Sequence, residues 1–170
     1  TKNTACGMEA LHNNTGGSLN TAVGYGACFS NTGGTNNTAL GMQSLNVNVE
    51  GIGNVAVGYR ALYLGNRGSS ETNAIPVVDQ CKNNTAIGML SLSASGFVGR
   101  KNTAIGVQTG SLSGTSAVSN TNCTMVGFQA GPSSGTVNNQ VILGNSSVTS
   151  LRCATTSITS LSDRRDKTDI

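Results

Sequence analysis

The chain has 170 residues, a formal net charge of +3 and only 10% charged residues, and Gly, Asn, Ser and Thr (23, 20, 20 and 20 residues) make up close to half of it. An ordinary globular domain carries about 25% charged residues, so we do not expect one thick core of large side chains. The positive charge is small and gathers in part at Arg164, Arg165 and Lys167, which disfavours a nucleic-acid partner, and no apolar run reaches the roughly 18 residues of a membrane span.

A five-residue unit with the pattern Asn-Thr-Ala-aliphatic-Gly recurs along the chain. Copies occupy residues 3–7, 20–24, 37–41, 54–58, 84–88 and 102–106, and two degenerate copies follow at 123–127 and 140–144. The last residues of the units step by 17, 17, 17, 30, 18, 21 and 17 positions. These structural glycines of the repeat are Gly7, Gly24, Gly41, Gly58, Gly88, Gly106, Gly127 and Gly144.

Each unit is predicted to be a short strand that ends in a glycine bend. A repeat of about 17 residues is too short for a pair of helices, and Gly and Asn at this density disfavour helix. Because side chains alternate along a strand, the second and fourth residues of a unit, such as Thr103 and Ile105, share one face. We expect that face to be the interior and the intervening residue, such as Ala104, to point outward.

One coil of this length cannot bury its own apolar face, so the coils must stack on one another. The sequence therefore predicts an all-β fold, a parallel β-roll or β-solenoid whose coils lie about 4.8 Å apart. A rod this slender leaves exposed sides, which packing three rods around an axis would cover, so we expect a homotrimer. The β-roll is expected to span residues 1–147 and an extended neck residues 148–161.

The step of 30 residues between Gly58 and Gly88 marks an insertion within residues 63–83. A long excursion from a rigid scaffold is a common place for binding function. Its charged residues are therefore the candidate receptor-binding residues, namely Arg67, Glu71, Asp79 and Lys82. The alternative is a surface insertion that the fold merely tolerates.

Few residues favour a catalytic or metal site, and we expect neither a metal nor a cofactor. The five cysteines are Cys6, Cys28, Cys81, Cys123 and Cys153. Their odd number and the lack of a Cys-x-x-Cys spacing favour buried free thiols over disulfides or a zinc site. His12 is the only histidine and lies in a polar turn, and Tyr25 and Tyr59 hold equivalent repeat positions. That equivalence favours a stacked ladder within the roll over a sugar-binding platform.

The repeat and the C-terminal residues together resemble viral fibre proteins. The units, of which residues 102–106 are the cleanest, resemble the coils in the heads of trimeric autotransporter adhesins, which are left-handed parallel β-rolls assembled as homotrimers. The same kind of repeat occurs in viral and phage tail fibres, and residues 141–151 are similar to the segment that ends such fibres. Residues 162–170, Ser-Asp-Arg-Arg-Asp-Lys-Thr-Asp-Ile, resemble the opening of the endosialidase-type intramolecular chaperone domain, here truncated.

The chaperone resemblance implies self-cleavage, because in that family the C-terminal domain drives trimerisation and then cuts itself off between Ser and Asp. Carried over, Ser162 is the nucleophile, Ser162–Asp163 the scissile bond and Lys167 the base that activates the hydroxyl. Only eight residues follow Ser162. We therefore expect cleavage only in a precursor that carries the full chaperone domain, and no enzyme activity of the repeat domain.

The resemblance implies a structural protein of a virion, the shaft or head of a viral or phage tail fibre that attaches to the host surface. The expected partners are two further copies of the chain and a host receptor, either a glycan or a surface protein. One alternative is the head of a bacterial trimeric autotransporter-type adhesin, on the bacterial cell surface. A polysaccharide-degrading tailspike is disfavoured because no paired acids recur, and an ice-binding repeat because the repeated Thr is expected to point inward.

Overall fold

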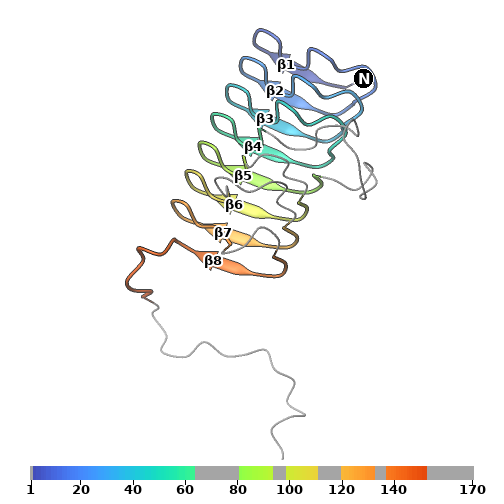
Figure 1. The fold of residues 1–170 in the computed structure, drawn as a ribbon. Coiled ribbons are helices and arrows are strands. Elements are labelled where there is room, and N and C mark those ends of the chain that lie inside the picture. Colours follow the sequence, from blue (N-terminus) through green and yellow to red (C-terminus); the bar gives the residue numbers. More distant parts are fainter. Residues whose placement is uncertain (1, 64–80, 94–98, 111–119, 133–136, 153–170) are drawn as a thin grey trace, which may run out of the picture.

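The computed structural model describes residues 2–63, 81–93, 99–110, 120–132 and 137–152, which form a stack of short parallel strands (Figure 1). The strands are β1 (Thr4–Cys6), β2 (Thr21–Val23), β3 (Thr38–Leu40), β4 (Val55–Val57), β5 (Thr85–Ile87), β6 (Thr103–Ile105), β7 (Thr124–Val126) and β8 (Val141–Leu143). They pair in chain order in one parallel sheet, and each residue lies beside its repeat equivalent, as Ala22 does beside Ala39.

The described residues contain no helix, so the prediction of an all-β solenoid with coils of about 17 residues is confirmed. The step of 30 residues does not interrupt the sheet, because Val55 of β4 pairs directly with Thr85 of β5. Of the predicted neck, residues 148–152 are described and are exposed, and the remainder lies outside the described residues.

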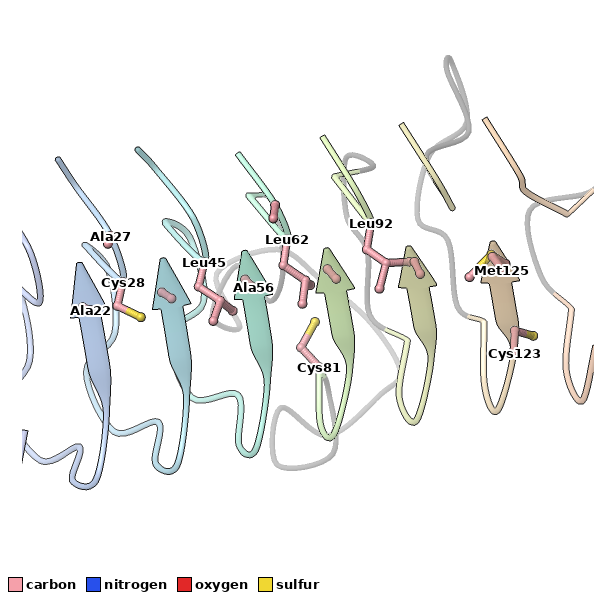
Figure 2. Close-up of a cluster of buried hydrophobic side chains, with 14 of the residues drawn as sticks. Ala22, Ala27, Cys28, Leu45, Ala56, Leu62, Cys81, Leu92, Cys123 and Met125 are labelled. Atoms are coloured by element: carbon pink, nitrogen blue, oxygen red, sulfur yellow. The ribbon is translucent and has the colours of Figure 1, made fainter. Parts of the chain in front are cut away.

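The predicted orientation of the strand faces is wrong. The central alanines of β2 to β6 are fully buried, whereas the residues on either side of them are exposed or half-buried, and Leu40 keeps 48% of its surface. The reason is the narrowness of the coil. Leu45, Leu62 and Leu92 enter the same interior from the far side of the coil (Figure 2), which leaves the strands room for little more than a methyl group.

These buried leucines lie at a left-handed bend of the backbone, where φ is between 49° and 51° for all three. A left-handed conformation costs a residue with a Cβ roughly 1–2 kcal/mol. Full burial of a leucine side chain contributes about 1.5–3 kcal/mol, which offsets that cost. The bend therefore depends on an apolar side chain that can fill the interior at this position.

Glycine ends every repeat unit for two physical reasons. At Gly41 the backbone has a φ of +129°, a conformation that residues with a Cβ rarely adopt. A Cβ at Gly41 would also lie 2.7 Å from the carbonyl oxygen of Gly58 in the next coil. Gly7, Gly24, Gly58, Gly88, Gly106 and Gly127 share this conformation, with φ from +121° to +134°, whereas Gly144, which ends the stack, has a φ of +74°.

An asparagine at the start of each of the first six coils forms a clamp across the interior. The Asn20 side-chain amide donates to the carbonyl oxygen of Gly34 at 2.8 Å, and Asn54 donates in the same way to Cys81 at 2.6 Å. The side-chain oxygen of Asn54 accepts from the backbone N–H of Asn84 in the next coil at 3.1 Å. Each clamp therefore closes its own coil and also holds the coil that follows.

A second asparagine column explains the glycines in the polar turns. The Oδ1 atoms of Asn31 and Asn48 are buried without a hydrogen-bond donor among the described residues. A Cβ at Gly34 or Gly51 would overlap these oxygens. The oxygens therefore face glycine Cα–H groups, which are weak donors, and the Asn-x-x-Gly spacing of the turns follows.

The interior changes in composition toward the C-terminal end while staying filled. Gly110 holds the repeat position at which the previous coil has Leu92, and Met125 of β7 holds the position that is alanine in β2 to β6. A Cβ at Gly110 would lie 3.2 Å from the terminal methyl of Met125. Met125 therefore fills the space that the missing leucine leaves.

Replacing Gly41 by Ala is expected to lower the free energy of unfolding by roughly 3 kcal/mol or more, because strain at positive φ adds to a clash with backbone. Urea unfolding measures this. The matched control is Gly33→Ala, since Gly33 does not have a positive φ and its nearest neighbour to a new Cβ is Glu50 Cγ at 3.9 Å. Equal stability of the two variants would contradict the steric role of Gly41.

Replacing Asn54 by Ala is expected to cost about 2–6 kcal/mol, because the Cys81 carbonyl and the Asn84 N–H each lose a buried partner. Urea unfolding of Asn54→Ala and of Asn13→Ala provides the comparison. Asn13 is exposed, and no side-chain hydrogen bond of Asn13 is found among the described residues. A cost for Asn54→Ala no larger than that for Asn13→Ala would show that the clamp does not stabilise the coil.

A double-mutant cycle can test whether Met125 fills the space left by the glycine at position 110. Met125→Ala is expected to cost about 2–5 kcal/mol through the cavity it leaves, and Gly110→Leu about 1–3 kcal/mol through overpacking. Together the two changes restore the leucine–alanine arrangement of the previous coil, so the double variant should be more stable than Met125→Ala. Strictly additive costs would contradict the shared space.

Candidate interaction surface

The outward side of the sheet is apolar along the whole stack. Its first column consists of the initial strand residues, which are Thr except for Val55 and Val141, and its second column consists of Cys6 and seven aliphatic residues. Leu40, Ile105 and Val141 are 48%, 41% and 73% exposed. Neither column contains a charged residue. We call these two columns the sheet face.

The sheet face is about 34 Å long, because eight strands are separated by about 4.8 Å each. Soluble monomers rarely expose a continuous apolar patch of this extent. The six threonine side chains add methyl groups and hydroxyls at regular intervals, and none of their hydroxyls is bonded to a described residue. The face is therefore suited to contact with another ordered surface.

A second exposed column follows the glycine bend. It contains Met8, Tyr25, Met42, Tyr59 and Met89, which are 37% to 71% exposed. The two tyrosines hold equivalent positions as predicted, but they lie on the outside of the coil and not within the roll. Hydrogen bonding to the Glu9 carboxylate, together with its negative charge, raises the pKa of Tyr25.

Beyond this column, the coil segment that follows β4 holds an arginine between aromatic rings. The Arg60 guanidinium carbon lies 5.2 Å from the centroid of the Tyr59 ring and 4.8 Å from that of Tyr63. Arg60 Nε donates to Gln43 Oε1 at 2.7 Å. The equivalent positions two and three coils before Tyr63 hold Phe29 and His12, whose rings stack with centroids 5.1 Å apart.

 In chain order this column runs His12, Phe29, Asn46 and Tyr63, so Phe29 lies two coils and His12 three coils before Tyr63.

The structure places one of the four predicted receptor-binding residues. Lys82 lies on a rung where Ile52 and Lys82 form a parallel bridge, and its carbonyl accepts from the backbone N–H of Lys101 at 2.9 Å. Arg67, Glu71 and Asp79 lie outside the described residues. Sequence reasoning missed Arg100 and Lys101, although aligning residues 99–102 with residues 81–84 would have placed them beside Lys82.

The residues predicted for self-cleavage, Ser162, Asp163 and Lys167, also lie outside the described residues. That prediction therefore remains a prediction. Of the remaining chemistry-bearing residues, His12 is exposed in its turn, as expected.

Three of the cysteines are buried free thiols, as predicted, namely Cys28, Cys81 and Cys123. Burial raises the pKa of Cys28 to about 12, so its thiol stays protonated at neutral pH and is a poor nucleophile. The prediction is wrong for Cys6, which is free but exposed on the sheet face. Cys153 lies outside the described residues.

Across the described ranges, no three His, Cys, Asp or Glu side chains come together in a group that could hold a metal ion. The same ranges contain no helix long and apolar enough to cross a membrane. Comparisons of the chain with protein-family models, with curated proteins and with solved structures found no match.

Proposed function

We propose that the chain is a structural module of a viral or phage tail fibre, a homotrimeric β-solenoid that takes part in attachment to the host surface. The single observation that carries this proposal is the uncharged, apolar sheet face that runs along all eight strands. A rod whose longest side is apolar needs a partner of equal length. A second and a third copy of the same rod meet that need.

Three copies around an axis suit this face better than one partner of another shape. Every strand has the same register, so identical chains side by side would bring equivalent rungs to the same height. The aliphatic side chains of the sheet face are Val, Leu and Ile, which lie beside six Thr and Cys6, and burial of their apolar surface contributes about 25 cal/mol per Å². The resemblance of the repeat to trimeric adhesin heads supports the same assembly.

The order of repeat, neck and terminal motif favours a virion protein over the alternative, a bacterial adhesin head. In this proposal residues 162–170 are the opening of a chaperone domain. Cleavage at Ser162–Asp163, with Lys167 as base, then belongs to a precursor that carries that domain in full. A polysaccharide-degrading tailspike remains the less favoured reading.

The outward threonine column gives a second candidate function. The inward orientation on which ice binding was disfavoured is wrong, since Thr4, Thr21 and Thr38 are exposed. Regular hydroxyl and methyl groups on a flat face could order water for ice binding. Val55 and Val141 interrupt the column, and the same face cannot bind ice while it is buried between copies.

The native mass in solution tests the proposal. The protein is expected to be a trimer that resists SDS at room temperature, and Ile87→Glu with Ile105→Glu should yield monomers, because charges would enter an apolar interface. The matched control is Ile52→Glu, since Ile52 is a 37% exposed isoleucine that does not belong to the sheet face. A monomeric wild-type protein would contradict the fibre proposal and favour ice binding.

A further inference from the structure

Three neighbours hold the Arg60 side chain: Tyr59 and Tyr63 from its own coil and Gln43 from the previous coil. Tyr59 and Tyr63 each lie within about 5 Å of the guanidinium carbon, at 5.2 Å and 4.8 Å from ring centroid to carbon. The Gln43 side-chain oxygen accepts from Nε at 2.7 Å. An arginine held this way has lost much of its rotamer freedom before any ligand arrives.

The contacts of Arg60 use one edge of the guanidinium group. Among the described residues, only Nε donates a hydrogen bond, and no carboxylate pairs with the group. The column that contains Arg60 also contains Glu9, but Glu9 lies three coils away, about 14 Å along the stack, and interacts with Tyr25. The two terminal nitrogens can therefore donate parallel N–H bonds, held in a fixed direction, to the two oxygens of a carboxylate.

The surroundings indicate what kind of molecule carries that carboxylate. Tyr59 is 37% exposed and Met42, one coil earlier, is 46% exposed, so flat and polarisable surfaces lie beside the guanidinium. The Gln43 amide nitrogen and the tyrosine hydroxyls supply further hydrogen-bonding groups. Sugars present this combination, with apolar C–H faces that stack on aromatic rings and hydroxyls at the rim.

We propose that Arg60, with Tyr59, Tyr63 and Gln43, forms a binding site for a carboxylate-bearing saccharide. The terminal nitrogens of Arg60 bind the sugar carboxylate in bidentate fashion, and Tyr59 stacks on the sugar ring. This inference rests on the proposed attachment function and names the chemical class of the receptor. The site lies beyond the glycine bend, away from the sheet face, so a trimer presents three such sites.

The test uses the full chain and a trisaccharide of galacturonic acid, with the methyl ester of the same trisaccharide as the uncharged control. Saturation-transfer NMR measures binding. The acid should bind and the ester should bind at least about tenfold more weakly, because the ester removes the charge and one acceptor oxygen. Equal binding of acid and ester, or no binding of the acid, would overturn the site.

Two variants of Arg60 separate its geometry from its charge. Arg60→Gln should fold normally, because Gln43, Gln108 and Gln129 hold the equivalent position at similar φ. Arg60→Lys keeps the charge but not the paired donors. Both are expected to weaken binding roughly tenfold or more, whereas Arg152→Gln, an exposed arginine elsewhere, should not. Wild-type affinity of Arg60→Lys would overturn the bidentate assignment.

A short acidic peptide of equal charge distinguishes the class of ligand. Weaker binding of the peptide than of the trisaccharide supports the saccharide assignment, and equal or tighter binding of the peptide overturns it. The native mass of each variant separates this site from the proposed function. If a variant loses binding but stays trimeric, the result bears on the Arg60 site and leaves the fibre proposal standing. If the wild-type protein is monomeric, the fibre proposal is contradicted.

Discussion

The closure of the first six coils by an asparagine side chain is the interaction on which the stack depends. The donor and acceptor of this clamp are 14 residues apart in the regular coil of Asn20, 27 residues apart in that of Asn54 and 18 in that of Asn102, yet the donor–acceptor distances are 2.8, 2.6 and 2.7 Å. The clamp therefore fixes the two ends of a coil whatever the length of chain between them. Because its side-chain oxygen also holds the next coil, a coil of unusual length leaves the register of its neighbours unchanged.

The sequence was sufficient to predict the repeat, the strands and the glycine bends, because each is a local property of the five-residue unit. It was not sufficient to orient the strands. The alternation of side chains along a strand predicts that Thr103 and Ile105 share a face, but it does not predict which face points into the coil. That choice is made by Leu92 and its equivalents, which come from the other side of the coil and leave room only for Ala104. The widths of the coil and of its side chains decide the orientation, and neither appears in the pattern of one strand.

The candidate sites also differ in how far the sequence could predict them. We assigned Lys82 to the insertion from the sequence, although the register of the repeat would have placed it beside Arg100 and Lys101 on the next coil. The surroundings of Arg60 could not be predicted from one coil, because Gln43 belongs to the previous coil, 17 residues earlier. A side chain in a solenoid has its nearest neighbours one coil away. Columns of equivalent positions, read across coils, are therefore the signal from which such a site can be found.

The stacked coils also place the surface proposed for assembly and the site proposed for ligand binding on different sides of one small chain. In the proposed trimer the sheet face must stay free of charge at every rung, because a single charge there would be repeated three times around the axis. The segments beyond the glycine bend are free of that demand, and the same column holds Glu9, Gln43, Arg60 and Leu90. In the proposed fibre a weak site in this column would gain from assembly, since three copies would raise the effective concentration of sites at a surface. Because the proposed assembly uses the sheet face alone, the residues beyond the bend can vary from coil to coil, and this variation is what would let one coil carry a ligand site that its neighbours lack.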